Sequence, residues 1–277
     1  MTLSGESPPP LGAGIATFLS WWFEQQRLTD QDQQFLEDYY ASFRRSFGPR
    51  MRRLYSEQVR EVEGILKDRP GLRLLEIGCG LGTESLWFAL KGARVTGLDV
   101  RKDRITVARA RQQVVEDMLD QSLACTFEIA SVLDYSAEPF DVVWLEQAFH
   151  HLEPRADVVP KLASLVVPGG HLVISEANAL NPFLQIELLV RRGLPRVTKY
   201  SSPDGQIRYY GVERITTASA LSRAFSDKGV AFRSLRRFRV FPNRPVFERL
   251  SGLEAALERN WLSPLLTHYN YIGSKLP

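Results

Sequence analysis

The sequence predicts an α/β fold with a mostly parallel sheet, and two observations support this prediction. Seven short apolar runs resemble strands, and most are separated by helix-like runs, as expected for a parallel sheet covered by helices. The first run, residues 72–77, leads directly into three glycines and then into a helix-like run at 84–90. This order brings a ligand against a helix N-terminus at the carboxyl edge of a parallel sheet. The expected strands are residues 72–77, 94–100, 125–129, 139–146, 171–176, 230–241 and 267–275.

Size and composition narrow the class of protein. The chain has 277 residues, enough for one large domain or for one domain with an added cap. Its 35 basic and 32 acidic residues nearly balance, so charge gives no indication of a nucleic-acid partner. Two cysteines and four histidines do not indicate a disulfide framework or a metal site. No run approaches the roughly 20 apolar residues that span a bilayer. We therefore expect a cytoplasmic chain without a metal and without stable membrane insertion.

The residues of the glycine turn indicate which class of ligand it binds. Glu76 precedes Gly78, Gly80 and Gly82, a spacing that differs from the Gly-x-Gly-x-x-Gly of dinucleotide sites. Residues 82–84 lack the lysine of a Walker-type phosphate loop, and an acid beside the turn would repel a pyrophosphate. The turn therefore favours a ligand with a zwitterionic head and no phosphate. The alternative is a glycine-rich turn of some other α/β domain.

This stretch resembles motif I of the class I S-adenosylmethionine-dependent methyltransferases. Three further landmarks follow in the family's order: Asp99 at the end of a strand, a strand at 139–146 like motif IV, and a Pro-Gly-Gly turn at 168–170 before the next strand. The resemblance implies a doubly wound, seven-stranded Rossmann-like methyltransferase fold. It also implies S-adenosylmethionine as cofactor and S-adenosylhomocysteine as product.

The resemblance also assigns residues to the cofactor. The Asp99 carboxylate would accept both ribose hydroxyls, because a carboxylate only accepts hydrogen bonds and lies beside the glycine turn; its alternative role is a simple cap of the strand end. Ser131 stands where many relatives carry an aspartate that binds the adenine amine, and Asp134 is the alternative for this role. The expected cofactor residues are Glu76, Gly78, Cys79, Gly80, Gly82, Thr83, Asp99, Val100, Ser131, Val132, Leu133 and Glu146.

Two adjacent histidines, His150 and His151, are the candidate catalytic residues. In O-methylation a base removes a hydroxyl proton as the methyl group transfers, and histidine titrates in the required range. Adjacent side chains on a helical turn point about 100° apart, so at most one is expected to face the substrate. The alternative is that one histidine packs the loop and the other binds to it, since related enzymes often act by proximity alone.

Two segments flank the expected core. Residues 1–70 are predicted to form an N-terminal helical segment, and residues 71–277 the methyltransferase domain. Related helices close over the cofactor, so Tyr39, Tyr40 or Arg50 could contact its methionine carboxylate, with packing as the alternative. The aromatic run at 15–23 is expected to pack in the core rather than to form a lip over the site or a membrane-touching edge.

A long basic and aromatic segment at about 178–216 is expected to be a cap over the substrate site, with a short helix at 183–192. Its cations and tyrosines favour an anionic or amphiphilic substrate, and the alternative is a solvated face. We expect methyl transfer to an oxygen or nitrogen of a small molecule. A nucleic-acid or protein target is the alternative, but residues 145–148 lack the Asn/Asp-Pro-Pro-Tyr/Phe signature of some nucleic-acid enzymes. A non-catalytic partner subunit is the third alternative, and the sequence leaves the oligomeric state open.

Overall fold

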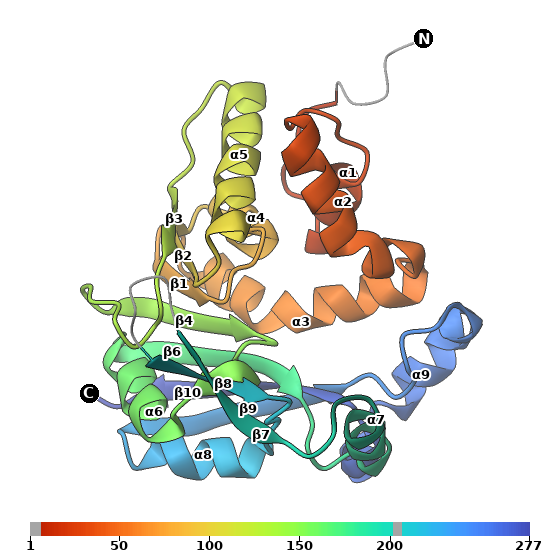
Figure 1. Ribbon diagram of the computed structural model, residues 1–277, viewed down its shortest axis with the longest axis vertical. Helices are drawn as coiled ribbons and strands as arrows, with labels where there is room; N and C mark the ends of the chain where they lie inside the picture. Colours follow the sequence, from red (N-terminus) through yellow and green to blue (C-terminus); the bar gives the residue numbers. More distant parts are fainter. Residues whose placement is uncertain (1–6, 202–206) are drawn as a thin grey trace. The chain divides into compact units, whose positions relative to one another are not determined.

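The computed structural model describes residues 7–201 and 207–277. Its main sheet has seven strands in the order β3-β2-β1-β4-β6-β10-β9, which confirms the predicted seven-stranded, mostly parallel sheet (Figure 1). The chain divides into two compact units, residues 1–131 with 243–251 and residues 132–242 with 252–277. Each unit has its own strands, helices and core.

The first unit contains three parallel strands, β1 (Arg73–Ile77), β2 (Arg94–Asp99) and β3 (Cys125–Ile129). Helix α4 (Thr83–Leu90) begins directly after the glycine turn, and α5 (Lys102–Leu119) follows β2. Leu74 and Leu75 in β1 have no exposed surface, as expected for a strand covered on both faces. This unit therefore places the end of β1, the glycine turn and the end of β2 at one edge of the sheet.

Three helices precede β1 in the same unit: α1 (Ile15–Trp22), α2 (Asp30–Arg45) and α3 (Pro49–Asp68). Phe18 and Trp22 of α1 are fully buried, so the aromatic run packs in the core and the suggestion of a membrane-touching edge is wrong. Thr29 caps α2 by accepting a hydrogen bond from the Asp32 backbone N–H at 3.3 Å. A short 3-10 helix, η2 (Pro245–Leu250), returns from the end of the chain and contacts α3.

The second unit contains β4 (Phe140–Glu146), β6 (Val166–Ala177), β9 (Val230–Phe238) and β10 (His268–Lys275). Strands β4 and β6 are parallel, and β10 runs antiparallel between β6 and β9. Its helices include α6 (Arg155–Ser164) and α8 (Ala218–Ser226), and Thr217 caps α8 through the Ala220 backbone N–H. The antiparallel last pair matches the family pattern that the sequence indicated.

The predicted Pro-Gly-Gly turn does not lie outside the strand, because β6 already begins at Val166. The register with β4 moves from Phe140↔Val166 to Val142↔His171, so residues 167–170 form an irregularity opposite one residue of β4. Gly169 has a φ of +77°, and a Cβ on Gly170 would lie 2.8 Å from the Asp141 carbonyl oxygen. The two glycines therefore allow the strand to bulge where the sequence indicated only a turn.

The segment at 178–216 folds as helix α7 (Pro182–Arg192) followed by strands β7 (Arg196–Ser201) and β8 (Ile207–Val212). The short helix predicted here is confirmed. The strands β7 and β8 pair with each other and with β5 (Leu152–Glu153) in a separate three-stranded sheet. The chain ends with α9 (Ser251–Leu257), η3 (Asn260–Leu265) and β10. Among the described residues, no helix combines the length and the apolar character needed to cross a membrane.

Candidate functional site

The glycine turn joins β1 to α4 in a conformation that only glycine adopts easily. Gly78, Gly80 and Gly82 have φ values of +78°, +54° and +72°, all in the left-handed region. A Cβ at Gly82 would lie 2.5 Å from the Phe127 ring, and one at Gly80 would lie 2.7 Å from the Tyr39 hydroxyl oxygen. The turn therefore keeps its backbone accessible at positions where any side chain would collide with the surrounding unit.

Backbone hydrogen bonds hold the turn against β2. The N–H groups of Gly78 and Cys79 donate to the Leu98 carbonyl at 2.7 and 2.9 Å. Cys79 is buried, and burial raises the pKa of its thiol well above the usual range, so this cysteine stays protonated. Glu76 is also buried, and one of its partners is Ser85 of α4, whose hydroxyl donates to the carboxylate. The structure thus gives Glu76 and Cys79 inward positions beneath the turn.

Asp99 lies where the sequence placed it, beside the glycine turn. Its Oδ2 accepts from the Gly80 backbone N–H at 3.1 Å and from Arg104 at 3.3 Å, and its Oδ1 accepts from the Arg101 backbone N–H at 2.9 Å. The Asp99 side chain is almost entirely buried, whereas the next residue, Val100, is 54% exposed. Each carboxylate oxygen accepts about two hydrogen bonds, so the Oδ1 atom retains capacity for a ligand hydroxyl.

A buried arginine, which the sequence did not single out, supports the turn from behind. Arg111 of α5 has no exposed surface, and its Nη1 donates to the Leu81 carbonyl at 2.6 Å and to Thr83 Oγ1 at 2.8 Å. Thr83 Oγ1 also shares a 2.7 Å hydrogen bond with the Tyr40 hydroxyl. Burial lowers the pKa of Arg111 and raises that of Tyr40 to about 12. Arg111 therefore links α5, the turn and α2.

The N-terminal residues proposed for the methionine carboxylate have distinct surroundings. The Tyr39 hydroxyl stands over Gly80, and its ring lies under the Arg104 guanidinium at 5.5 Å. The Tyr40 hydroxyl is hydrogen-bonded to Thr83 Oγ1. Arg50 is fully buried in α3, and its backbone N–H donates to the Glu248 carboxylate at 2.9 Å. Of the three, Tyr39 has the most direct approach to the glycine turn.

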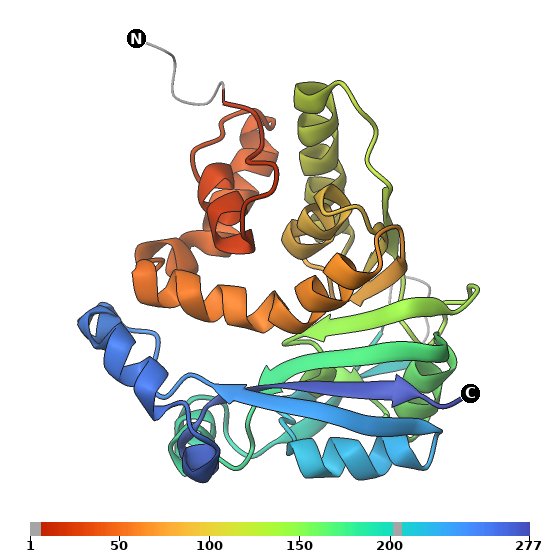
Figure 2. The same ribbon diagram turned by 180° about the vertical axis from the view of Figure 1, so that it is seen from behind.

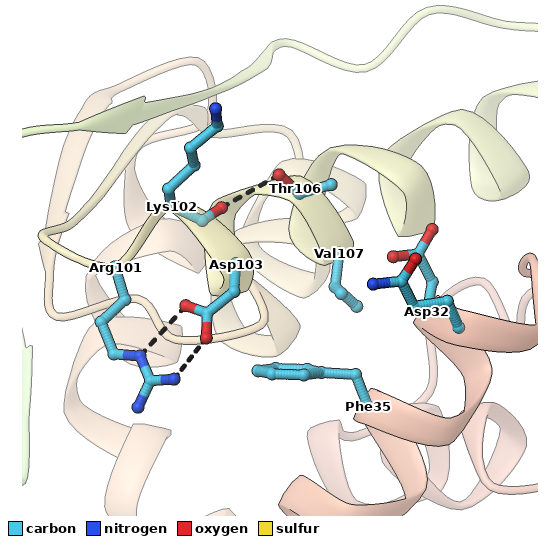
Figure 3. Close-up of a pocket in the computed structure, with 8 residues that line it drawn as sticks. Asp32, Phe35, Arg101, Lys102, Asp103, Thr106 and Val107 are labelled. Atoms are coloured by element: carbon cyan, nitrogen blue, oxygen red, sulfur yellow. Dashed lines mark hydrogen bonds and ion pairs between the residues drawn. The ribbon is translucent and has the colours of Figure 1, made fainter.

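A pocket of about 560 Å³ opens between α2 and the first turns of α5, immediately after Val100 in the chain. Figure 3 shows Phe35 and Val107 facing each other across it, and the Arg101 guanidinium bound to the Asp103 carboxylate at one side. None of the expected cofactor residues lines this pocket. It is therefore a recess next to the Asp99 strand end and does not itself contain the glycine turn.

The remaining expected cofactor residues lie near the boundary of the two units. Ser131 is the last residue of this part of the first unit, and Val132, Leu133 and Glu146 belong to the second. Val132 is buried, whereas Ser131, Leu133 and Glu146 are half-buried. Their contact with a cofactor stays a prediction.

The two histidines lie on a short 3-10 helix of the second unit, η1 (Phe149–His151), and have different surroundings. His150 Nδ1 lies 2.9 Å from Oε2 of Glu176, a fully buried residue near the end of β6, and the His150 backbone N–H donates to the same carboxylate. Burial lowers the pKa of His150, but the hydrogen bond and charge of Glu176 outweigh this effect, so the pKa lies above its usual value. The carboxylate thus engages His150 Nδ1, and Nε2 is the remaining ring nitrogen.

His151 uses both ring nitrogens within the protein. Its Nδ1 lies 2.9 Å from the Gly211 carbonyl oxygen and must donate to it, so Nε2 accepts from the Tyr210 hydroxyl at 3.0 Å. A Cβ at Gly211 would lie 2.4 Å from the His150 carbonyl oxygen, which shows how closely β8 packs on η1. Burial lowers the pKa of His151. Burial and the charge of His150 thus favour neutral His151, while Tyr210 and Gly211 hold its ring in a structural position.

Glu176 was identified from the sequence only as a strand end, and its pairing with His150 was missed. The two residues are 26 positions apart, and only the approach of η1 to the end of β6 reveals the pair. Among the described residues, no group of three or more histidine, cysteine, aspartate and glutamate side chains is arranged to hold a metal ion.

Comparisons with known proteins identify the kind of domain that this chain contains. Residues 75–172 match a family model described as a methyltransferase domain. The 27-O-demethylrifamycin SV methyltransferase of Amycolatopsis mediterranei is 32% identical over 116 residues, which is 42% of each chain. The ubiquinone biosynthesis O-methyltransferase of Aeromonas salmonicida is 38% identical over 122 residues, 43% of this chain and 49% of that protein. The matches thus span less than half the length of these relatives.

The fold is similar to that of solved methyltransferases. The crystal structure of magnesium protoporphyrin IX methyltransferase from Synechocystis PCC 6803, with bound S-adenosylhomocysteine, aligns with a TM-score of 0.55 at 17% identity, covering 88% of this chain and 99% of that one. This likeness concerns the fold alone. Residues 75–172 therefore match a methyltransferase domain, and the seven-stranded sheet has the fold of the class I S-adenosylmethionine-dependent methyltransferases.

Proposed function

We propose that the protein transfers a methyl group from S-adenosylmethionine to an oxygen or nitrogen of a small molecule. The observation that carries this proposal is the hydrogen bond between the Gly80 backbone N–H and the Asp99 carboxylate, which joins the glycine turn to the acid at the neighbouring strand end. A turn without side chains and an acceptor for a diol are the two features that an adenosyl group with no phosphate requires.

The residues of the first unit fit this cofactor. The Asp99 Oδ1 retains capacity for a ribose hydroxyl, and the exposed Val100 offers an apolar surface for a base. The glycine turn brings backbone N–H groups to the start of α4 without a lysine that would select phosphate. Tyr39, which stands over Gly80, is the residue of α2 that we assign to contact the cofactor. S-adenosylmethionine, when bound, supplies a methyl group already activated by the sulfonium.

Catalysis in this proposal has two parts. Most of the rate comes from aligning the acceptor with the methyl group in a dehydrated site, which needs no chemistry from the protein. His150 supplies the second part: its Nε2 takes the proton from the acceptor, and Glu176 stabilises the resulting imidazolium through Nδ1. His151 is not assigned this role, because both of its ring nitrogens are engaged.

The acceptor is proposed to be an oxygen on an anionic or amphiphilic molecule. Two of the relatives are named for O-methylation, which supports oxygen over nitrogen. The hairpin of β7 and β8 presents half-exposed tyrosines and cations, among them Lys199 over the Tyr209 ring at 5.6 Å. We also place the protein in the cytoplasm, where the buried thiols of Cys79 and Cys125 would stay reduced.

The experiment is methyl-labelled S-adenosylmethionine incubated with the full chain and, separately, with metabolite extract, protein extract and nucleic acid. The proposal predicts label in extractable small molecules and binding of S-adenosylhomocysteine by calorimetry. Label recovered only in protein or nucleic acid would assign the enzyme to a macromolecular substrate. Absence of any cofactor binding would favour a non-catalytic subunit that keeps the fold.

A further inference from the structure

Helix α7 exposes an unusually large apolar face. Phe183, Ile186, Leu189 and Val190 are 70%, 60%, 50% and 80% exposed, and their spacing places them along one side of the helix. No residue of α7 is buried, whereas α8 buries Ala218, Leu221 and Phe225. Contiguous exposed apolar surface of this kind marks an interaction site.

Helix α7 is joined to a neighbouring segment, η3, which carries an exposed tryptophan. In Figure 1 and Figure 2 α7 lies beside the segment of η3, and the two elements are in contact. The Asn181 side chain caps α7 through the Leu184 N–H at 2.8 Å and donates to the Leu265 carbonyl at 2.7 Å. Trp261 of η3 is 78% exposed. The exposed groups are therefore held on ordered elements that hydrogen bonds join.

Cations border this apolar face. Arg191 and Arg192 close α7, and Arg196 and Lys199 follow in β7, all of them exposed. Arg191 pairs with Glu187 at 3.0 Å and Arg192 with Glu213 at 3.5 Å, so the four cations and two acids give a local charge of 4 − 2 = +2. The "α7 surface" comprises Phe183, Ile186, Leu189, Val190, Leu194 and Trp261 with Arg191, Arg192, Arg196 and Lys199.

We propose that the α7 surface docks the protein on a bilayer that contains anionic lipid. An amphipathic helix with a Phe- and Leu-rich face and flanking arginines lies in the plane of a membrane interface, with its apolar face among the acyl chains and its cations at the headgroups. A tryptophan beside the helix fits the same interface, where an apolar ring meets a wet boundary. Docking is peripheral, since no described helix is built to cross the membrane.

The charge of the α7 surface favours a lipid over a second copy of the chain. Two identical surfaces, each carrying a local charge of +2, would repel each other on close approach. An anionic bilayer neutralises the same cations. Docking requires neither cofactor nor methyl transfer, so it can be tested independently of the proposed function.

The experiment uses the full chain with vesicles of phosphatidylcholine alone and of phosphatidylcholine mixed with phosphatidylglycerol. Trp261 supplies the signal, because the other four tryptophans, Trp21, Trp22, Trp87 and Trp144, are each no more than 6% exposed. The mixed vesicles should shift the tryptophan emission to the blue and carry the protein on flotation. Added salt should weaken binding, since it screens the cations. The Trp261→Phe variant should still float without the shift.

Two variants separate the contributions of charge and apolar contact. Arg191→Gln/Arg192→Gln should reduce partitioning about fivefold for each cation removed, or about 25-fold together. Phe183→Ser/Ile186→Ser should reduce it at least about tenfold. The matched control is Phe232→Ser/Arg233→Gln, which removes an exposed aromatic ring and a cation from β9. This control should bind as the parent does, and circular dichroism checks that every variant is folded.

Several results would overturn the proposal. One is a parent that binds neither kind of vesicle, and another is binding to phosphatidylcholine alone with equal strength. A third is partitioning of the folded α7 variants that equals that of the parent. Concentration-dependent dimerisation that Phe183→Ser/Ile186→Ser abolishes, without vesicle binding, would assign the surface to a second copy instead. If a variant does not fold, the salt dependence and the Trp261 emission of the parent decide the question.

Discussion

Replacing Glu176 by glutamine is expected to destabilise the second unit, and most strongly at acidic pH. Glu176 is fully buried and accepts hydrogen bonds from His150 Nδ1 and from the backbone N–H groups of His150 and Ala177. Breaking a buried ion pair by removing one partner costs about 3–5 kcal/mol, whereas losing a neutral buried hydrogen bond costs about 1–3 kcal/mol. The larger cost applies while His150 is charged, and the smaller one applies when it is neutral.

The pH dependence follows from the pKa of His150. Burial lowers this pKa, but the hydrogen bond and charge of Glu176 together with the charge of Glu213 outweigh burial and raise it above its ordinary value. A histidine of this kind adds stability that is fully present below its unfolded pKa of about 6.5 and is lost as pH rises through its folded pKa. The difference in unfolding free energy between parent and variant should therefore shrink as pH increases from about 5 to about 9.

Urea unfolding across this pH range measures the difference directly, and histidine NMR measures the pKa values. In the parent, His150 should titrate above its usual value and His151 below it. In Glu176→Gln the His150 signal should move to lower pH, because burial then acts without the opposing carboxylate. A parent His150 that titrates below about 6.5, or a stability difference that grows with pH, would refute the reasoning.

Three further predictions concern the turn and the base. Gly82→Ala should lower the free energy of unfolding by about 1–3 kcal/mol in a thermal scan, and by more than Gly92→Ala does. Both glycines have positive φ, but only a Cβ at Gly82 would collide with an aromatic ring. Equal losses of stability in the two variants would contradict this collision. Arg111→Met should lower the free energy of unfolding by about 1–3 kcal/mol, because the turn loses two buried hydrogen bonds. It should also weaken binding of S-adenosylhomocysteine at least about tenfold in calorimetry, and unchanged affinity would remove its positioning role. His150→Ala should lower the turnover rate about 10²-fold or more and abolish its rise with pH. His151→Phe should keep that rise. If the pH profile of His150→Ala equals that of the parent, His150 is excluded as the base.

The sequence predicted the part of the site that depends on local backbone chemistry. Gly78, Gly80 and Gly82 carry positive φ values that few other residues adopt, and Asp99 ends the neighbouring strand. Because parallel strands end at one edge of a sheet, the glycine turn and Asp99 can be predicted to lie close together without knowledge of the rest of the chain. The predicted position of Asp99 beside the turn is confirmed by its bond to Gly80.

The parts that sequence reasoning missed depend on packing between distant residues. Arg111 sits in a helix with many charged residues, and nothing local distinguishes the one that turns inward under the glycine turn. The pairing of His150 with Glu176 and of His151 with Gly211 likewise requires the folded arrangement of η1, β6 and β8. Cations and tyrosines stand next to each other in strands β7 and β8, so their hydrophobic pattern is too weak to predict a sheet.

The position of α7 shows a different limit. A short helix was predicted at 183–192, as part of a cap over a substrate, and α7 confirms the helix. The exposure of its apolar residues, which only coordinates reveal, is what supports the proposed membrane surface. An amphipathic pattern alone does not say whether the apolar face meets a core, a substrate or a lipid.

Calorimetric titration of S-adenosylhomocysteine into the parent, Asp99→Asn and the control Asp32→Asn tests the central claim most directly. We expect the parent and the Asp32 variant to bind alike and Asp99→Asn to bind about 10²-fold more weakly, because hydrogen bonds to a charged group are worth about 1.5–3 kcal/mol each. A parent that binds no S-adenosylhomocysteine, or an Asp99 variant that binds it as tightly as the parent, would contradict the account.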